Sequence, residues 1–333
     1  MDLRSDTVTR PTPEMRRAMA SAEVGDDGYG EDPTVAALEH EYAERVGKEE
    51  ALLVPSGTMA NQLAIRVLAR PGTLALAGAH QHVIAHETGA MAALAGVQPH
   101  CVEDGSGILD PLDIIWARQA GAHHWPELGL VCVESTHMAS GGTPWSLEQL
   151  VEVRRAAGEV PIHIDGARLF NAEAATSVPA ARYAAEATTV MSCLSKGLCA
   201  PVGSLLAGPA DLIAEARYER HRLGGAMRQA GVLAAAGLVA LRTMIDRLPE
   251  DHARARLLAE AVASRWPDAG CDPRRVRTNI VVFRPPDPGA LLEHLHSHGV
   301  LAGTIAPGVV RLVTHHDVDD AGVAAACRAL ASA

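Results

Sequence analysis

The hydrophobic positions of the chain follow two different spacings. Short runs of aliphatic residues, which indicate buried strands, alternate with longer segments in which apolar side chains recur at helical spacing. The predicted strands are Ala51–Val54, Leu74–Ala79, Leu130–Val133, Val160–Ile164 and Thr188–Cys193. This alternation, from residue 51 to about 207, predicts an α/β fold with a mostly parallel sheet and helices on both faces.

After residue 209 the sequence predicts helices, including the apolar segment Ala230–Leu241, which is too short to span a bilayer. A second pattern follows, in which three helices alternate with the strands Asn279–Phe283 and Val309–Thr314. A chain of 333 residues exceeds what one hydrophobic core usually serves. We therefore predict a large domain over residues 1–248, N-terminal segment included, and a smaller C-terminal α+β domain over residues 249–333.

Two candidate reactive groups follow predicted strands. Lys196 lies past Thr188–Cys193 among small and apolar residues, where poor solvation lowers the pKa of a lysine amine. Asp165 follows Val160–Ile164, at the strand end where open α/β sheets place ligand-binding groups. Such an acid and amine suit pyridoxal phosphate (PLP), because the acid pairs with the ring nitrogen and the amine holds the aldehyde. A solvated surface lysine and a helix-capping aspartate are the alternatives.

The turn Pro55–Asn61 joins a strand to the predicted helix Gln62–Ala69 and forms a candidate anion site. Free backbone N–H groups converge at a helix N-terminus, Gly57 permits a close approach of the backbone, and Thr58 offers a hydroxyl. The turn has neither the P-loop lysine nor a G-x-G-x-x-G pattern. An ordinary strand–helix connection is the alternative.

Two further patterns concern a possible metal and a buried cation. His82 and His86 would share one helix face, but H-E-x-x-H is absent because position 90 is Ala90. We predict no metal and a ring-stacking or acid–base role for His82. Arg311 lies inside an apolar strand and needs an anionic partner, either a substrate carboxylate or an Asp or Glu of the chain.

Composition excludes several classes of function. The net charge is −11 and no run of lysine or arginine occurs, which argues against nucleic-acid binding and against docking on an anionic membrane. Six cysteines without framework spacing predict reduced thiols and, with the polar first residues, a cytoplasmic location.

Taken together, a series of segments resembles the L-threonine aldolases of the low-specificity type, within the beta-eliminating lyase/threonine aldolase family. The resemblance covers essentially the whole chain and lies in the order and spacing of DLRSDTVTRP, VGDDGYGEDPTV, PSGTMANQ, ESTH, HIDGARLFNA, SCLSKGLCAPVGSLLAG, GGAMRQAG and VRLVTH. It implies the aspartate-aminotransferase fold (PLP fold type I) and a homotetramer, built as a dimer of dimers with shared active sites. The family's E-N-T-H is E-S-T-H here, with Ser135, and His86 has no family role to inherit.

The resemblance also implies which residues bind the cofactor. Lys196 would carry PLP covalently, Asp165 would pair with the ring nitrogen, Arg168 would contact the ring hydroxyl, and His82 would stack on the ring. The residues implied for the phosphate are Gly57, Thr58 and, from a neighbouring subunit, Arg228.

For the substrate, the resemblance implies cleavage of L-threonine, L-allo-threonine and other β-hydroxy-α-amino acids to glycine and an aldehyde. Ser5 and Arg311 would hold the carboxylate, with Arg168 nearby, His124 would lie near the β-hydroxyl and Tyr29 near the pocket. His82, His124 or a bound water could be the base. The rival functions are β-elimination by a related PLP lyase, a metal enzyme using His82, His86 and Glu87, and a non-catalytic binding protein.

Overall fold

A seven-stranded sheet forms the centre of the structure, a computed structural model that describes all 333 residues. Its strands lie in the order β1-β7-β6-β5-β4-β2-β3. Only β7 runs antiparallel to its neighbours β1 and β6. The strands are β1 (Glu50–Val54), β2 (Leu74–Gly78), β3 (Gln98–Val102), β4 (Leu128–Glu134), β5 (Ile162–Asp165), β6 (Thr189–Cys193) and β7 (Ser204–Gly208).

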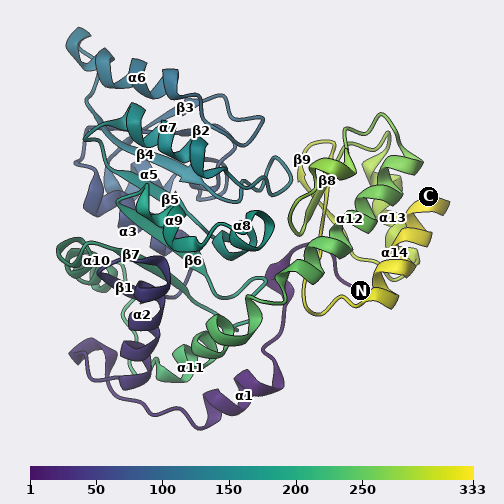
Figure 1. The fold of residues 1–333 in the computed structure, drawn as a ribbon, viewed down its shortest axis with the longest axis horizontal. Helices are drawn as coiled ribbons and strands as arrows, with labels where there is room; N and C mark the ends of the chain where they lie inside the picture. The colour runs from purple at the N-terminus through teal and green to yellow at the C-terminus, as the bar shows by residue number, and fades with distance from the viewer.

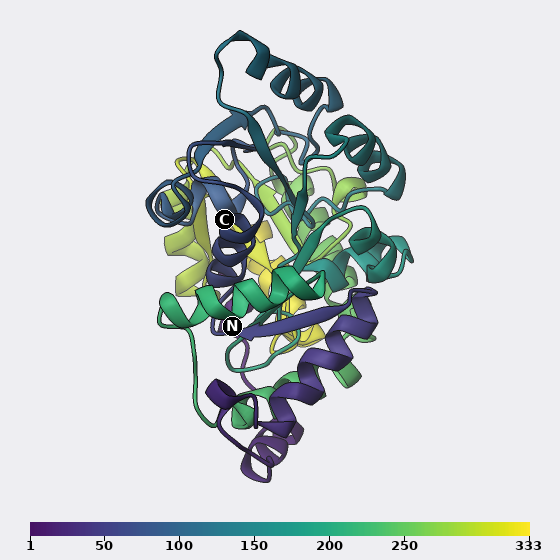
Figure 2. The ribbon, with the colours of Figure 1, turned by 90° about the vertical axis from the view of Figure 1, so that its left-hand side faces the viewer.

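Helices cover both faces of this sheet, as Figure 2 shows. One face packs against α3 (Gly57–Leu68), α5 (Ala90–Ala95) and α10 (Ala210–Arg222). The opposite face contributes to the largest hydrophobic core, with α1 (Pro13–Ala20), α2 (Pro33–Val46), α6 (Pro111–Ala120), α7 (Leu147–Ala157), α8 (Leu169–Thr176), α9 (Ala180–Ala185) and α11 (Gly231–Val239). The short elements are η1 (Asp6–Val8), η2 (Asp27–Tyr29), α4 (His82–Ala85), η3 (Gly121–His123), the π-helical turn η4 (Ala240–Met244) and η5 (Pro273–Arg275).

The C-terminal part of the chain has its own core. An antiparallel sheet in the order β8-β10-β9 packs with the last helices, on the right of Figure 1. These elements are β8 (Ile280–Phe283), β9 (Gly303–Ala306), β10 (Val309–Val313), α12 (Leu248–Arg265), α13 (Pro288–Ser297) and α14 (Asp320–Ser332). The first residues of the chain join this core: Leu3 is fully buried in it and hydrogen-bonds Leu301 and Val313 through its backbone.

The predicted α/β class with a mostly parallel central sheet is confirmed. The division into residues 1–248 and 249–333 stays a prediction, although residues 1–3 pack with the C-terminal core rather than with the large one. One boundary differs: the helix expected at Gln62 begins at Gly57, because the Ser56 hydroxyl caps it by accepting the Met59 N–H. None of the helices combines the length and the hydrophobicity needed to cross a membrane.

We predict that Leu3→Ala lowers the free energy of unfolding by about 2–5 kcal/mol, the usual range for truncating a buried leucine. Because Ser5 and Asp6 follow Leu3, the substitution also loosens the segment that leads to the central cavity described below. Urea unfolding measures the first effect, and the rate of proteolysis near the N-terminus measures the second. Val24→Ala, at a position 42% exposed, is the control, and equal stability of the two variants would contradict the expectation.

Candidate active site

Lys196 and Asp165 line one cavity of about 450 Å³ at the carboxyl ends of β5 and β6, hereafter the central cavity. Asp165 ends β5 and is 3% exposed, whereas Lys196 lies just past β6 and is half-buried. Other predicted site residues that line the central cavity are Ser5, Gly57, His82, Arg168 and Arg311. Six chain segments distant in sequence therefore meet around one space large enough for a small ligand.

Lys196 differs from the rest of the basic residues in type and in surroundings. Of the 29 lysines and arginines of the chain, only Lys48 and Lys196 are lysines. Lys48 donates from Nζ to the Ala187 carbonyl at 2.6 Å, whereas Nζ of Lys196 has no hydrogen-bond partner in the chain. An amine that faces a cavity without a partner is free to bond a carbonyl carbon.

The Asp165 carboxylate is held by two donors. Oδ1 accepts the Ala167 N–H at 3.1 Å, and Oδ2 accepts an N–H of the Asn61 side chain at 2.7 Å. These bonds fix the orientation of the carboxylate. Asp165 can therefore present negative charge to a cationic ring nitrogen.

The N-terminus of α3 forms the end of the central cavity that suits an anion. Its first turn contains Gly57 and Thr58, and the N–H groups of a first helical turn have no partners within the helix. A Cβ on Gly57 would lie 2.9 Å from Sγ of Cys193, so the space there admits glycine but no side chain. Thr58 is in the same turn but does not itself line the central cavity.

His82 lies between two buried carboxylates. Its Nδ1 is 2.9 Å from Oε1 of Glu87, and its backbone N–H donates to Oε2 of Glu134 at 2.6 Å. Burial lowers the pKa of His82, but the hydrogen bond to Glu87 and the charge of Asp165 outweigh it, so the net shift is upward. Burial and the adjacent Asp165 charge raise the pKa of Glu134 to about 7. A proton can thus be held or released here near neutral pH.

Arg168 forms a buried ion pair that joins three parts of the chain. Its Nε and Nη2 donate to the two oxygens of Asp6 at 2.7 and 2.6 Å, and Nδ2 of Asn279 donates to Oδ2 of Asp6 at 3.1 Å. Burial alone raises the pKa of Asp6, but the charge and hydrogen bonds of Arg168, together with Lys196 and Asn279, outweigh it and hold that pKa well below its usual range. Nη1 of Arg168 remains without a partner in the chain.

Arg311, in β10, has no carboxylate partner in the chain. Its Nη2 donates only to the Arg4 carbonyl, at 2.8 Å, and its buried Nε has no hydrogen-bond partner. Burial, followed by repulsion from Arg168, lowers the pKa of Arg311 to about 10, so it remains charged at neutral pH. No Asp or Glu of the chain therefore serves as the structural partner of Arg311, and its guanidinium is available to an anion from outside the chain.

The group of candidate metal ligands in the structure differs from the one predicted, which was His82, His86 and Glu87. The group whose candidate ligand atoms lie within 4.8 Å of one another consists of His82, Glu87 and Asp165, and His86 is not part of it. Within this group, Asn61 donates to both carboxylates and His82 already faces Glu87. His86 does line the central cavity, with its ring centroid 5.5 Å from that of His82.

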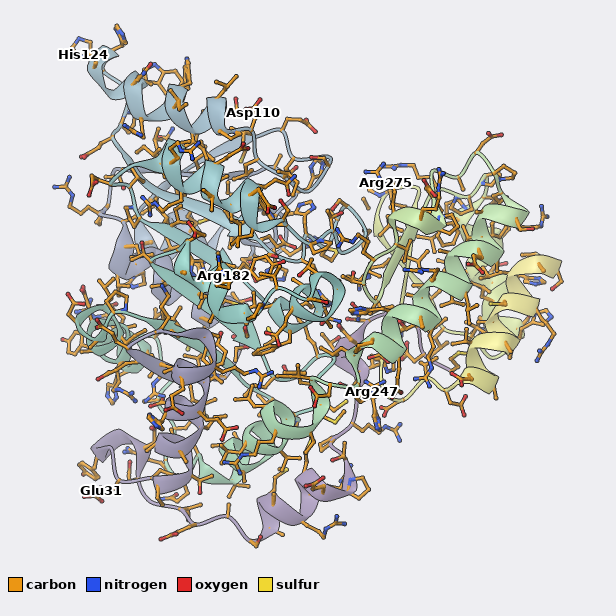
Figure 3. The ribbon with its side chains drawn as sticks, in the orientation of Figure 1. Glu31, Asp110, His124, Arg182, Arg247 and Arg275 are labelled. Carbon is orange, nitrogen blue, oxygen red and sulfur yellow. The ribbon has the colours of Figure 1, made fainter.

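Besides Thr58, three predicted site residues do not line the central cavity of this chain. His124 lies at the outer tip beyond α6, as Figure 3 shows, in a left-handed backbone conformation with φ 68°. Tyr29 is 78% exposed, and the exposed Arg228 side chain contacts Asp26. None of the three lines the central cavity. Their predicted roles stay predictions.

Sequence reasoning missed several residues of the site. Asn61 and Glu134 occur in the motifs PSGTMANQ and ESTH, but they received no role. Glu87 was considered only as a metal ligand, although it is 2% exposed and bonded to His82. The number of lysines could have identified Lys196 more directly, because the chain has only two and one of them follows a buried strand.

Comparison with known proteins places the chain in a family. Residues 2–285 match the family model described as "Beta-eliminating lyase". The chain belongs to the beta-eliminating lyase family. The probable low-specificity L-threonine aldolase 2 of Arabidopsis thaliana is 42% identical, over 97% of this chain and 94% of that protein. The low specificity L-threonine aldolase of Escherichia coli K12 is 39% identical, over 96% of this chain and 94% of that protein. The predicted family resemblance is confirmed.

The chain shares its fold with a solved structure, that of Leishmania major threonine aldolase. The TM-score is 0.83 at 20% identity, with 99% of this chain and 98% of that chain covered. That similarity concerns the fold alone.

The cavity residues of this family member fit PLP. The α3 N-terminus offers backbone N–H groups to an anion at Gly57, where a Cβ would crowd Cys193, and Asp165 suits a pyridinium nitrogen. The free amine of Lys196 suits the aldehyde. The unpartnered Nε of Arg311 remains for a second anion, such as a substrate carboxylate.

We predict that Asp6→Asn lowers the free energy of unfolding by about 3–5 kcal/mol, because it leaves the buried Arg168 charge unpaired. In the wild type, the depressed pKa of Asp6 makes the pair stabilising above the ordinary carboxyl pKa of 3.8, and the contribution is lost as the pH falls below it. Denaturant unfolding at pH 7 and in acid measures both effects. Asp2→Asn, which breaks the exposed pair with Arg4, is the control, and a comparable loss in both variants would contradict the expectation.

Proposed function

We propose that the protein is a PLP-dependent aldolase that cleaves L-threonine, L-allo-threonine and related β-hydroxy-α-amino acids to glycine and an aldehyde. The observation that supports it best is Arg311, a buried cation without a carboxylate partner, in the cavity that also contains Lys196 and Asp165. An amino-acid substrate supplies the missing carboxylate. The curated relatives named as low-specificity L-threonine aldolases support the same activity.

In this proposal, Lys196 bonds PLP covalently, Asp165 pairs with the ring nitrogen, and Gly57 and Thr58 bind the phosphate. When bound, PLP supplies an electron sink for the carbon–carbon bond that breaks. Asp165 keeps the ring nitrogen protonated because its own oxygens are already stabilised by Ala167 and Asn61. The free Nη1 of Arg168 is available for the ring hydroxyl.

Arg311 and Ser5 would fix the substrate carboxylate. Both line the central cavity, and a guanidinium binds a carboxylate through two parallel hydrogen bonds. A carboxylate held in this way fixes the rotation about the α-carbon. The bond to be broken is then presented in one orientation, which makes cleavage selective.

His82 would accept the proton of the substrate β-hydroxyl. Its Nδ1 faces Glu87, so Nε2 is the ring nitrogen that remains for the ligand. A neutral imidazole with Nδ1–H directed at a carboxylate is a positioned base. His124 from a second copy, or a bound water, remains the alternative base, and His86 is close enough to contact the same ligand.

A homotetramer with shared active sites would account for the residues that lie far from the central cavity. The loop with His124 also carries Trp125, whose ring centroid is 5.0 Å from that of Trp116. Trp125 is 45% exposed and Trp116 is 50% exposed. Two exposed tryptophans in contact are typical of protein interfaces. A second copy seated there would leave His124 at the subunit boundary, and Arg228 and Tyr29 would face a neighbour in the same way. A cytoplasmic location likewise stays a prediction.

Product analysis tests the proposed function. We expect the purified protein, supplied with PLP and L-threonine or L-allo-threonine, to release glycine and acetaldehyde in equal amounts. Ammonia and a keto acid from a β-substituted amino acid, without glycine, would instead show β-elimination, which the family description also covers. Activity that needs an added divalent ion and no PLP would contradict the proposal.

We predict that Arg311→Gln raises KM for threonine by roughly 10–100-fold, because one charged hydrogen-bonded contact with the carboxylate is lost. Steady-state kinetics with wild type and variant measure the change. Arg274→Gln, at an exposed arginine paired only with Asp272, is the control. An unchanged KM in Arg311→Gln would rule out the carboxylate clamp.

We also predict that kcat/KM rises with pH through a midpoint above 6.5, the ordinary value for His82, because the Glu87 contact raises its pKa and the base must be neutral. Glu87→Gln removes the carboxylate charge and should move the midpoint to lower pH. pH–rate profiles of the two proteins measure the shift. If the midpoints coincide, another group is the base.

A further inference from the structure

A continuous chain of hydrogen bonds runs along the wall of the central cavity from Asp165 to His82. Nδ2 of Asn61 donates one proton to Oδ2 of Asp165 at 2.7 Å and the other to Oε1 of Glu87 at 2.8 Å. The same Oε1 atom of Glu87 is 2.9 Å from Nδ1 of His82. Asn61, Glu87 and Asp165 are 1%, 2% and 3% exposed, so water does not compete for these bonds.

The orientation of the Asn61 amide is fixed from the other side. Its Oδ1 is 3.0 Å from Nε2 of His163, and Nδ1 of His163 is 2.9 Å from the Thr189 hydroxyl. Burial lowers the pKa of His163 to about 4, so its ring is neutral at pH 7. An amide oxygen only accepts, so Nε2 carries the single ring proton and Nδ1 accepts from Thr189. The Asn61 nitrogen therefore has both protons available for the two carboxylates.

We infer that Asn61 is a positioning residue that couples the acid facing the cofactor ring, Asp165, to the acid facing His82, Glu87. The inference rests on the proposed function in that it assigns Asp165 to the ring nitrogen. One nitrogen serves both acids, so a stronger bond to one weakens its bond to the other. A change of charge at Glu87 or His82 is thereby transmitted to the proton on the ring nitrogen.

Replacing Asn61, which bridges Asp165 and Glu87, should change the charge of the cofactor ring in one direction. Without the Asn61 donor, the Asp165 anion is less stabilised and draws the proton more strongly from the ring nitrogen. A ring that has lost positive charge withdraws fewer electrons from its linkage to Lys196. The pH midpoint of the cofactor absorbance change therefore moves upward, by roughly one pH unit, which is the size expected for one hydrogen bond to a charged group.

The first measurement is this absorbance midpoint in PLP-loaded protein without substrate. Asn61→Ala should raise it. Gln62→Ala is the matched control, because Gln62 is the next residue of α3 and donates to the other Glu87 oxygen, Oε2, at 2.6 Å, but does not contact Asp165. The control should stay near the wild-type midpoint. Equal midpoints for wild type and Asn61→Ala, or equal shifts in both variants, would overturn the inference.

The second measurement tests the coupling itself by a double-mutant cycle on the same midpoint. Glu87→Gln relieves Asn61 of a charged acceptor and should lower the midpoint in the wild-type background. In the Asn61→Ala background the lowering should be clearly smaller. Equal lowering in both backgrounds would mean that Glu87 acts through space alone and would overturn the bridge.

Two further comparisons keep the result decisive. If Asn61→Ala does not fold or bind PLP, as judged by thermal unfolding and bound absorbance, Asn61→Thr replaces it in both measurements, since one hydroxyl proton cannot serve two carboxylates. No measurement uses substrate. A protein with the expected midpoints but no glycine release would refute the aldolase activity and leave the role of Asn61 intact. Glycine release with equal midpoints would support the aldolase activity and refute the role of Asn61.

Discussion

The buried ion pair between Asp6 and Arg168 is the interaction on which the architecture of the site depends. It joins the N-terminal segment to the loop after β5, and Asn279 adds the start of β8 to the same carboxylate. Neither charge could remain buried without the other. Because Ser5 precedes Asp6 and Asp165 lies three residues before Arg168, the pair fixes the position of Ser5 relative to Asp165 in the central cavity.

Around this pair the charges are arranged in two groups. The cationic group that lines the central cavity consists of Arg311, Arg168 and Lys196. The second group, at the ends of the sheet strands and near α4, consists of Asp165, Glu134 and the Glu87–His82 pair. β4 and β5 pair in register at Glu134 and Asp165, which brings like charges together and raises the pKa of Glu134 to about 7. The pKa of Glu134 is raised while that of Arg311 is lowered. Shifted pKa values of this kind within one cavity are typical of a site that binds an ionic ligand and moves protons.

Much of the fold could be read from the chain, and the reasons for success and failure are physical. The strands that became β1, β2, β4, β5 and β6 are buried on both faces and are therefore continuous apolar runs. Strand β3 was not predicted, because it is an edge strand with exposed positions, Gln98 and Pro99 among them, and does not form a continuous apolar run. Lys196 and Asp165 were predicted from local sequence, since strand ends locate them. Asp6 and Asn61 act through partners far away in sequence, which no local pattern encodes. Tyr29, His124 and Arg228 do not line the central cavity of a single chain.

The central claim is that Lys196 forms the covalent bond to PLP, and the composition of the chain makes it directly measurable. Besides the N-terminal amine, only Lys48 and Lys196 offer amines, and burial lowers the pKa of Lys48 while its Nζ is bonded to Ala187. The measurement is reduction of the PLP-loaded protein with borohydride, followed by peptide mass spectrometry. The account predicts a phosphopyridoxyl group on the peptide that contains Lys196 and none on the peptide with Lys48. A label on Lys48, or an unlabelled Lys196 in protein that still binds PLP, would contradict it.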